Sequence, residues 1–114
     1  MKRAILLLAL TVAPAIAQPV SIRVETPRDM AGILGAVRVM TTECKLAVNS
    51  DLLGPAARRY GFNFVDFAPT GRFFTLTKKA MDENYALIAQ RGLGPACRSF
   101  SQLIELTMPE LLGR

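Results

Sequence analysis

The chain has 114 residues, of which 51% are hydrophobic, and a formal net charge of +5, which suits one globular domain rather than several. It contains no histidine, and this removes the usual general base near neutral pH, the Ser–His and Cys–His nucleophile pairs and the commonest zinc ligand. No run of Lys or Arg exceeds two residues, so the basic charge is of the kind that keeps a protein soluble and does not indicate a nucleic-acid-binding surface.

Residues 1–17 have the pattern of a secretory signal peptide, with a positive start, an apolar run and a small-x-small cleavage site at Ala15–Ala17. Cleavage before Gln18 would remove Lys2 and Arg3 and lower the net charge from +5 to +3. A membrane anchor is the alternative, but the apolar run of about 14 residues is shorter than the roughly 20 that a span needs. We therefore predict a periplasmic or secreted protein with no stable membrane anchor after cleavage.

Residues 18–26 form the predicted N-terminal arm. Apolar and polar residues alternate along it with period two, which is typical of extended chain. An irregular terminal arm is the simpler interpretation, since chain ends are usually loosely held. The alternative is an edge strand that pairs with a partner.

The clearest helix start is Thr26-Pro27, because threonine can cap the first free N–H groups and proline is tolerated at the first helical position. Apolar residues then recur at steps of three and four, which predicts an amphipathic helix of roughly 22 residues ending at Asn49. Gly32 and Gly35 weaken this helix by up to about 1 kcal/mol each. We interpret both as points of close contact with another helix; a ligand touching the backbone is the alternative.

The middle of the chain is predicted to hold a turn at 52–55, a short helix at 55–60 and an aromatic segment at 62–67. The aromatic segment contains three of the six phenylalanines, and we expect an extended chain that lays its rings across the helical core. It could instead pair with residues 20–24 as a two-stranded ribbon.

Two further helices are predicted in the C-terminal part. The first runs from Phe67 or Gly71 to Gln90, and the second from about 95 to Thr107, where Pro109 ends it. The first carries a charged face with two pairs of opposite charge at i,i+4 spacing. These pairs are Lys78–Asp82 and Lys79–Glu83.

The predicted fold is therefore all-α: residues 27–114 form one small bundle of three main helices and one short helix. Cys44 falls near the end of the first long helix and Cys97 in the first turn of the last. If these helices are antiparallel neighbours, the two sulfurs come level and a disulfide can form. A redox-active thiol at Cys97, beside Arg98, is the alternative, but no resolving cysteine lies within a few residues.

Arg58, Arg59 and Arg72 flank the aromatic segment and are the candidate anion-binding residues. The simpler interpretation is helix capping and solubility. Among the carboxylates, Glu105 alone falls beside an apolar stripe, and a single such group does not make an acid–base pair. We therefore predict no enzyme, no metal site and no cofactor.

The function predicted from the sequence is that of a small exported protein-binding or chaperone-like module, with an unknown protein partner or a second copy of itself and no nucleic acid. This predicts an exposed apolar patch larger than about 400 Å². The alternative is a carrier of a small molecule or anion, which predicts an enclosed cavity between helices ringed by the three arginines. An enzyme would need a cleft in which Glu105 or Asp66 is buried beside a second polar group.

Overall fold

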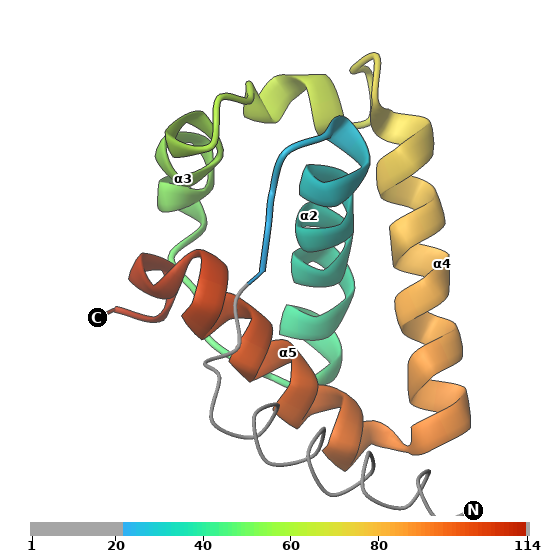
Figure 1. Ribbon diagram of the computed structural model, residues 1–114. Coiled ribbons are helices and arrows are strands. Elements are labelled where there is room, and N and C mark those ends of the chain that lie inside the picture. Colours follow the sequence, from blue (N-terminus) through green and yellow to red (C-terminus); the bar gives the residue numbers. More distant parts are fainter. Residues whose placement is uncertain (1–21, 114) are drawn as a thin grey trace, which may run out of the picture.

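A computed structural model describes residues 22–113, which contain helices joined by turns and irregular chain and no strand (Figure 1). Within this described range the four α-helices are α2 (Pro27–Glu43), α3 (Leu53–Arg59), α4 (Phe74–Arg91) and α5 (Leu93–Thr107). The three short 3-10 helices are η1 (Ser50–Leu52), η2 (Phe64–Phe67) and η3 (Pro109–Leu112). The predicted bundle of three long helices and one short helix is thus confirmed. The predicted signal peptide and the first residues of the arm lie outside the described residues.

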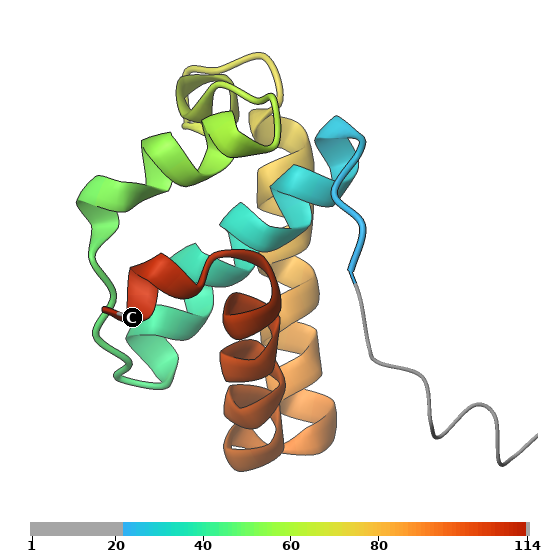
Figure 2. The same ribbon diagram turned by 60° about the vertical axis from the view of Figure 1, so that its left-hand side comes forward.

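Helix α2 is the centre of the fold. Nine of its 17 residues are buried, whereas only two of the 18 residues of α4 are. Helices α2 and α4 lie side by side and run in the same general direction, and α5 returns in the opposite direction (Figures 1 and 2). The chain between α2 and α4 therefore has to travel back along the molecule, and it does so through α3 and η2. No helix of the described chain is long and apolar enough to cross a membrane.

The start of α2 is held by a reciprocal cap. The Thr26 hydroxyl accepts a hydrogen bond from the Asp29 amide at 3.1 Å, and the Asp29 carboxylate accepts from the amides of Glu25 and Thr26, each at 3.0 Å. These backbone donors lower the pKa of Asp29 from its ordinary value of 3.8. The helix start predicted from Thr26 and Pro27 is confirmed.

The end of α2 differs from the prediction, because the helix stops at Glu43 and not at Asn49. Lys45 adopts the left-handed conformation with φ 54°, and the Leu46 amide donates to the Thr41 carbonyl at 3.1 Å, which closes the last turn. Beyond it, half-buried Leu46 and Val48 flank exposed Ala47. Such alternation is typical of extended chain. The apolar residues after Cys44 therefore do not continue the apolar stripe of α2, although their spacing in the sequence fits it.

Replacing Lys45 by glycine should stabilise the protein by up to about 1 kcal/mol. A lysine in the left-handed region is strained by roughly that amount, and glycine relieves the strain at the expense of a more flexible unfolded chain. Urea unfolding measures the change. Lys45→Ala is the control, because alanine keeps the strain; an equal gain in both variants would show that the lysine side chain, and not the backbone, is the cause.

The aromatic segment is compact rather than extended, since residues 64–67 form η2. The Asn63 side chain accepts a hydrogen bond from the Val65 amide at 3.2 Å and so starts the turn. Phe67 is fully buried, with ring centroids 5.9 Å from Phe62 and 5.2 Å from Phe73. The rings do pack against the helical core, as expected, but they reach it from a 3-10 turn. The alternative ribbon with residues 20–24 does not form among the residues that the structure describes.

The remaining helix bounds shift by a few residues. Helix α4 begins at Phe74, later than predicted, because residues 68–73 form turns after η2. Helix α3 begins at Leu53, ahead of the predicted start. Helix α5 begins at Leu93, directly after Gly92, whose φ of 90° breaks the chain direction between α4 and α5.

Candidate functional site

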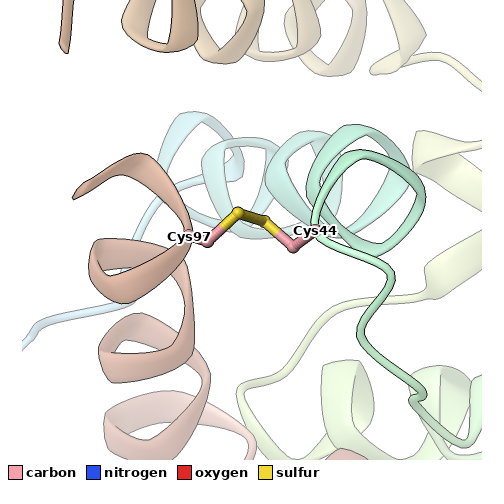
Figure 3. The surroundings of a disulfide bond; sticks show 2 residues. All are labelled: Cys44 and Cys97. Carbon is pink, nitrogen blue, oxygen red and sulfur yellow. A yellow bond between two sulfur atoms is a disulfide. The ribbon is translucent and has the colours of Figure 1, made fainter. Parts of the chain in front are cut away.

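Cys44 and Cys97 form a disulfide with their Cα atoms 5.7 Å apart, and Figure 3 shows the two side chains meeting from the end of α2 and the start of α5. Both residues are half-buried. The predicted staple between the first and last long helices is therefore present. A disulfide is compatible with an extracellular location, because such bonds persist in oxidising compartments.

Arg59, one of the candidate anion-binding residues, is occupied within the chain. Its guanidinium pairs with the Glu110 carboxylate, and its Nη2 donates to the Thr107 carbonyl at 2.7 Å. The Tyr60 hydroxyl donates to the same carbonyl at 2.6 Å. These bonds fasten the end of α3 to the C-terminal end of α5 and to η3.

The other two arginines have different surroundings. Arg72 pairs with the Asp66 carboxylate at 3.4 Å, and its guanidinium lies 4.6 Å from the centre of the Phe73 ring. Arg58 is exposed in the last turn of α3. Two of the three guanidinium groups thus already have a carboxylate partner, and the anion-binding patch stays a prediction. Glu105 is exposed on α5.

The Arg59–Glu110 pair makes stability depend on pH. The hydrogen bond from Arg59 lowers the pKa of Glu110 below its ordinary value of 4.5. A lowered folded-state pKa means that the stabilisation is complete above the unfolded value and is lost as the pH falls through the folded one.

We expect Glu110→Gln to be less stable than the wild type at pH 7 by about 1 kcal/mol or less, because the pair is partly exposed. Urea unfolding at a series of pH values from 7 to 3 should show the two proteins converging at the acid end. Asp29, whose pKa is also lowered, titrates equally in both and cancels in the comparison. A stability difference that stays constant down to pH 3 would contradict the assignment.

A pocket of about 140 Å³ opens between the first half of α2 and the first half of α4, and we name it the Gly32 pocket. Its lining residues are Arg28, Gly32, Leu76, Lys79, Ala80 and Glu83. Sites for drug-sized molecules usually measure about 300 to 1,000 Å³. The Gly32 pocket is therefore large enough for one small group and too small for a typical metabolite.

Two glycines of α2 that look alike in the sequence have different surroundings. A Cβ built on Gly35 would lie 2.6 Å from the Ala80 Cβ and 2.9 Å from the Thr77 carbonyl oxygen, so Gly35 is the close helix contact that was predicted. A Cβ on Gly32 would meet no atom within 4 Å. The prediction of a close helix contact is wrong for Gly32. The space beside it is open, because α4 makes its close approach at Gly35.

Several large hydrophobic side chains remain exposed among the described residues. They are Ile22, Val65, Tyr85, Leu93 and Leu106. Tyr85, with 51% of its surface exposed, lies in the second half of α4, and Leu93, with 45%, is the first residue of α5 after the break at Gly92. Ala89, also exposed, follows Tyr85 by about one helical turn in α4, and we name Tyr85, Ala89 and Leu93 the α4–α5 corner.

Histidine is absent from the sequence, and within residues 22–113 no three acidic or cysteine side chains gather as metal ligands. A scan against protein-family models matched no family, and neither a curated protein nor a solved structure matched the chain.

Proposed function

We propose that this chain is an exported protein-binding module that docks a protein partner, or a second copy of itself, through the α4–α5 corner. A chaperone-like role falls within this proposal. The observation that carries it is the exposure of two large hydrophobic side chains, Tyr85 in the second half of α4 and Leu93 at the start of α5. Tyrosine supplies a large contact area with few rotatable bonds, which makes it a frequent anchor in protein interfaces.

The disulfide near the α4–α5 corner supports the same proposal. The disulfide joins the start of α5 to the end of α2, close to Leu93 in the chain. A rigid surface loses little conformational entropy on binding, and this favours affinity. The signal-like residues 1–17 and the disulfide together support a periplasmic or secreted location for the module.

A carrier of small molecules is less well supported. It would require a cavity large enough to enclose its ligand, and the Gly32 pocket measures only about 140 Å³. That pocket is also lined by Arg28 and Lys79 rather than by Arg58, Arg59 or Arg72. The arrangement therefore favours recognition through a surface.

Site-specific photo-crosslinking tests the proposal. A photoreactive phenylalanine analogue replaces Tyr85 in one variant and Leu93 in another, and each oxidised protein is irradiated in the exporting cell. The control position is Ala86, which neighbours Tyr85 in sequence and is also exposed, but points to another side of α4.

We expect one discrete adduct from positions 85 and 93 and none from 86. An adduct of twice the chain mass would identify the partner as a second copy, and any other mass a different protein. A mutant with Tyr85→Ser and Leu93→Ser should lose the adduct when the photoreactive group is moved to the neighbouring Ala89. Equal labelling at 85, 86 and 93, or no discrete adduct at all, would overturn the proposal.

A further inference from the structure

The Gly32 pocket lies where α2 carries no side chain, opposite the first half of α4 and one turn before the close contact at Gly35. A Cβ at Gly32 would meet nothing within 4 Å, so the surface there is open. Ala80, which is 6% exposed, and half-buried Leu76 supply apolar lining from α4. The result is a small hollow with an apolar base between two packed helices.

Two cations stand at this hollow. Arg28 lies one helical turn before Gly32 on the same face of α2, and Lys79 reaches it from α4. Within residues 22–113, neither cation has a carboxylate oxygen within 4.0 Å. Lys78 does pair with Asp82, at 3.9 Å, whereas the equivalent pair predicted between Lys79 and Glu83 does not form. Arg28 acts on the neighbouring Asp29 carboxylate only through its charge and helps to lower the pKa of that group. The donors of Arg28 and Lys79 are thus available for an anion.

The charges around the hollow select the kind of anion. Among the lining residues, two cations and the Glu83 carboxylate leave an excess of one positive charge. The Asp29 carboxylate next to Arg28 does not line the pocket and accepts hydrogen bonds from the amides of Glu25 and Thr26. A single negative charge matches this excess, whereas the second charge of a phosphate would face Glu83 and be repelled. The apolar base offers contact to methylene groups beside the charged head. The volume of about 140 Å³ suits one short group of this kind.

We propose that the Gly32 pocket binds a carboxylate group on a short aliphatic stem. Arg28 and Lys79 hold the carboxylate, Leu76 and Ala80 contact the stem, and Glu83 excludes dianions. A glutamate side chain of a bound peptide and a small free carboxylic acid share this chemistry. Glu83 and Tyr85 point to nearly opposite flanks of α4, because two residues turn a helix by about 200°. The inference is therefore independent of binding at the α4–α5 corner.

Titration followed by NMR tests this site on the oxidised protein with residues 1–17 removed. The probes are N-acetyl-glutamate N-methylamide, its glutamine analogue, isobutyrate and inorganic phosphate, all at constant ionic strength because exposed charges are screened by salt. We expect saturable shifts of the Gly32 and Ala80 amide signals with a dissociation constant in the millimolar range. The glutamine analogue should bind at least about tenfold more weakly, since it lacks the charge.

Three variants locate the effect. Lys79→Gln should weaken carboxylate binding by about three- to tenfold, and Gly32→Leu should abolish it by filling the pocket. Lys78→Gln is the matched control, because it removes the same charge from the adjacent residue of the same helix and should leave binding unchanged. Lys79→Gln alters only an exposed side chain and keeps the test valid if Gly32→Leu does not fold.

The outcomes separate cleanly. Tighter binding of the glutamate derivative identifies a peptide side chain as the ligand, and tighter binding of isobutyrate identifies a free acid. Phosphate binding as strong as carboxylate binding, equal losses in Lys78→Gln and Lys79→Gln, or the absence of saturable shifts would each overturn the proposal. Crosslinking at the α4–α5 corner is a separate measurement. A negative result there would contradict the proposed function but not the carboxylate site, and a negative titration would contradict only the carboxylate site.

Discussion

Replacing both Cys44 and Cys97 by alanine should lower the free energy of unfolding by about 4 kcal/mol. The disulfide joins residues 53 positions apart, and the entropy of closing a loop of that length in the unfolded chain accounts for this value. Small domains are commonly stabilised by only about 5 to 15 kcal/mol in total. The double variant should therefore be marginally folded at 25 °C and largely unfolded well below the melting temperature of the wild type.

Urea unfolding followed by circular dichroism measures this loss, with the midpoint and slope compared between the proteins. Wild type held in reductant is the control, because it breaks the same link without changing any other atom of the core. Its midpoint should agree with that of the double alanine variant. A reduced protein as stable as the oxidised one would show that α2 and α5 hold together without the bond.

The second large effect concerns the crossing of α2 and α4. Gly35→Ala should lower the free energy of unfolding by about 2 kcal/mol, because the new methyl group would sit 2.6 Å from the Ala80 Cβ and 2.9 Å from a backbone oxygen, and the helices must separate to admit it. Gly32→Ala introduces the same methyl group one turn earlier, into open space. It should stabilise the protein by up to about 1 kcal/mol, the usual gain of alanine over glycine in a helix.

The two glycine variants control each other, since they have the same composition and lie in the same helix. Thermal and urea unfolding of both should therefore give shifts of opposite sign. Two stabilising shifts would mean that α4 does not pass as close to Gly35 as the structure shows. Two destabilising shifts would mean that the space beside Gly32 is occupied in solution.

Features encoded by neighbouring residues were predictable from the sequence. The start of α2 depends only on Thr26, Pro27 and Asp29, which are close together in the sequence. Thr26 and Asp29 form the cap, and proline occupies the first helical position, as these residue types predict. The pairing of Cys44 with Cys97 was also accessible, because only two cysteines exist and both fall on apolar helical stripes. Such signals need no knowledge of how the long helices are arranged.

Features set by packing were not predictable. Lysine has no preference for the left-handed conformation, so nothing in the local sequence marks Lys45 as the end of α2. The Gly32 pocket was missed for a related reason. Gly32 and Gly35 differ only in whether α4 passes over them, and that depends on the register between two helices separated by about 30 residues of intervening chain. Arg28 and Lys79 become candidate binding residues only through the structure, because they line the pocket beside Gly32.

The bond between Cys44 and Cys97 also turns more than half of the described chain into a covalent ring. Helices α3 and α4, with every connection between them, lie inside this ring. A protease that cuts a single peptide bond anywhere from 45 to 96 therefore releases nothing, because both fragments stay joined through sulfur. Separation of the fragments requires a second cut or a reductant. A single cut in an exposed connection of the ring therefore leaves the chain in one covalent piece.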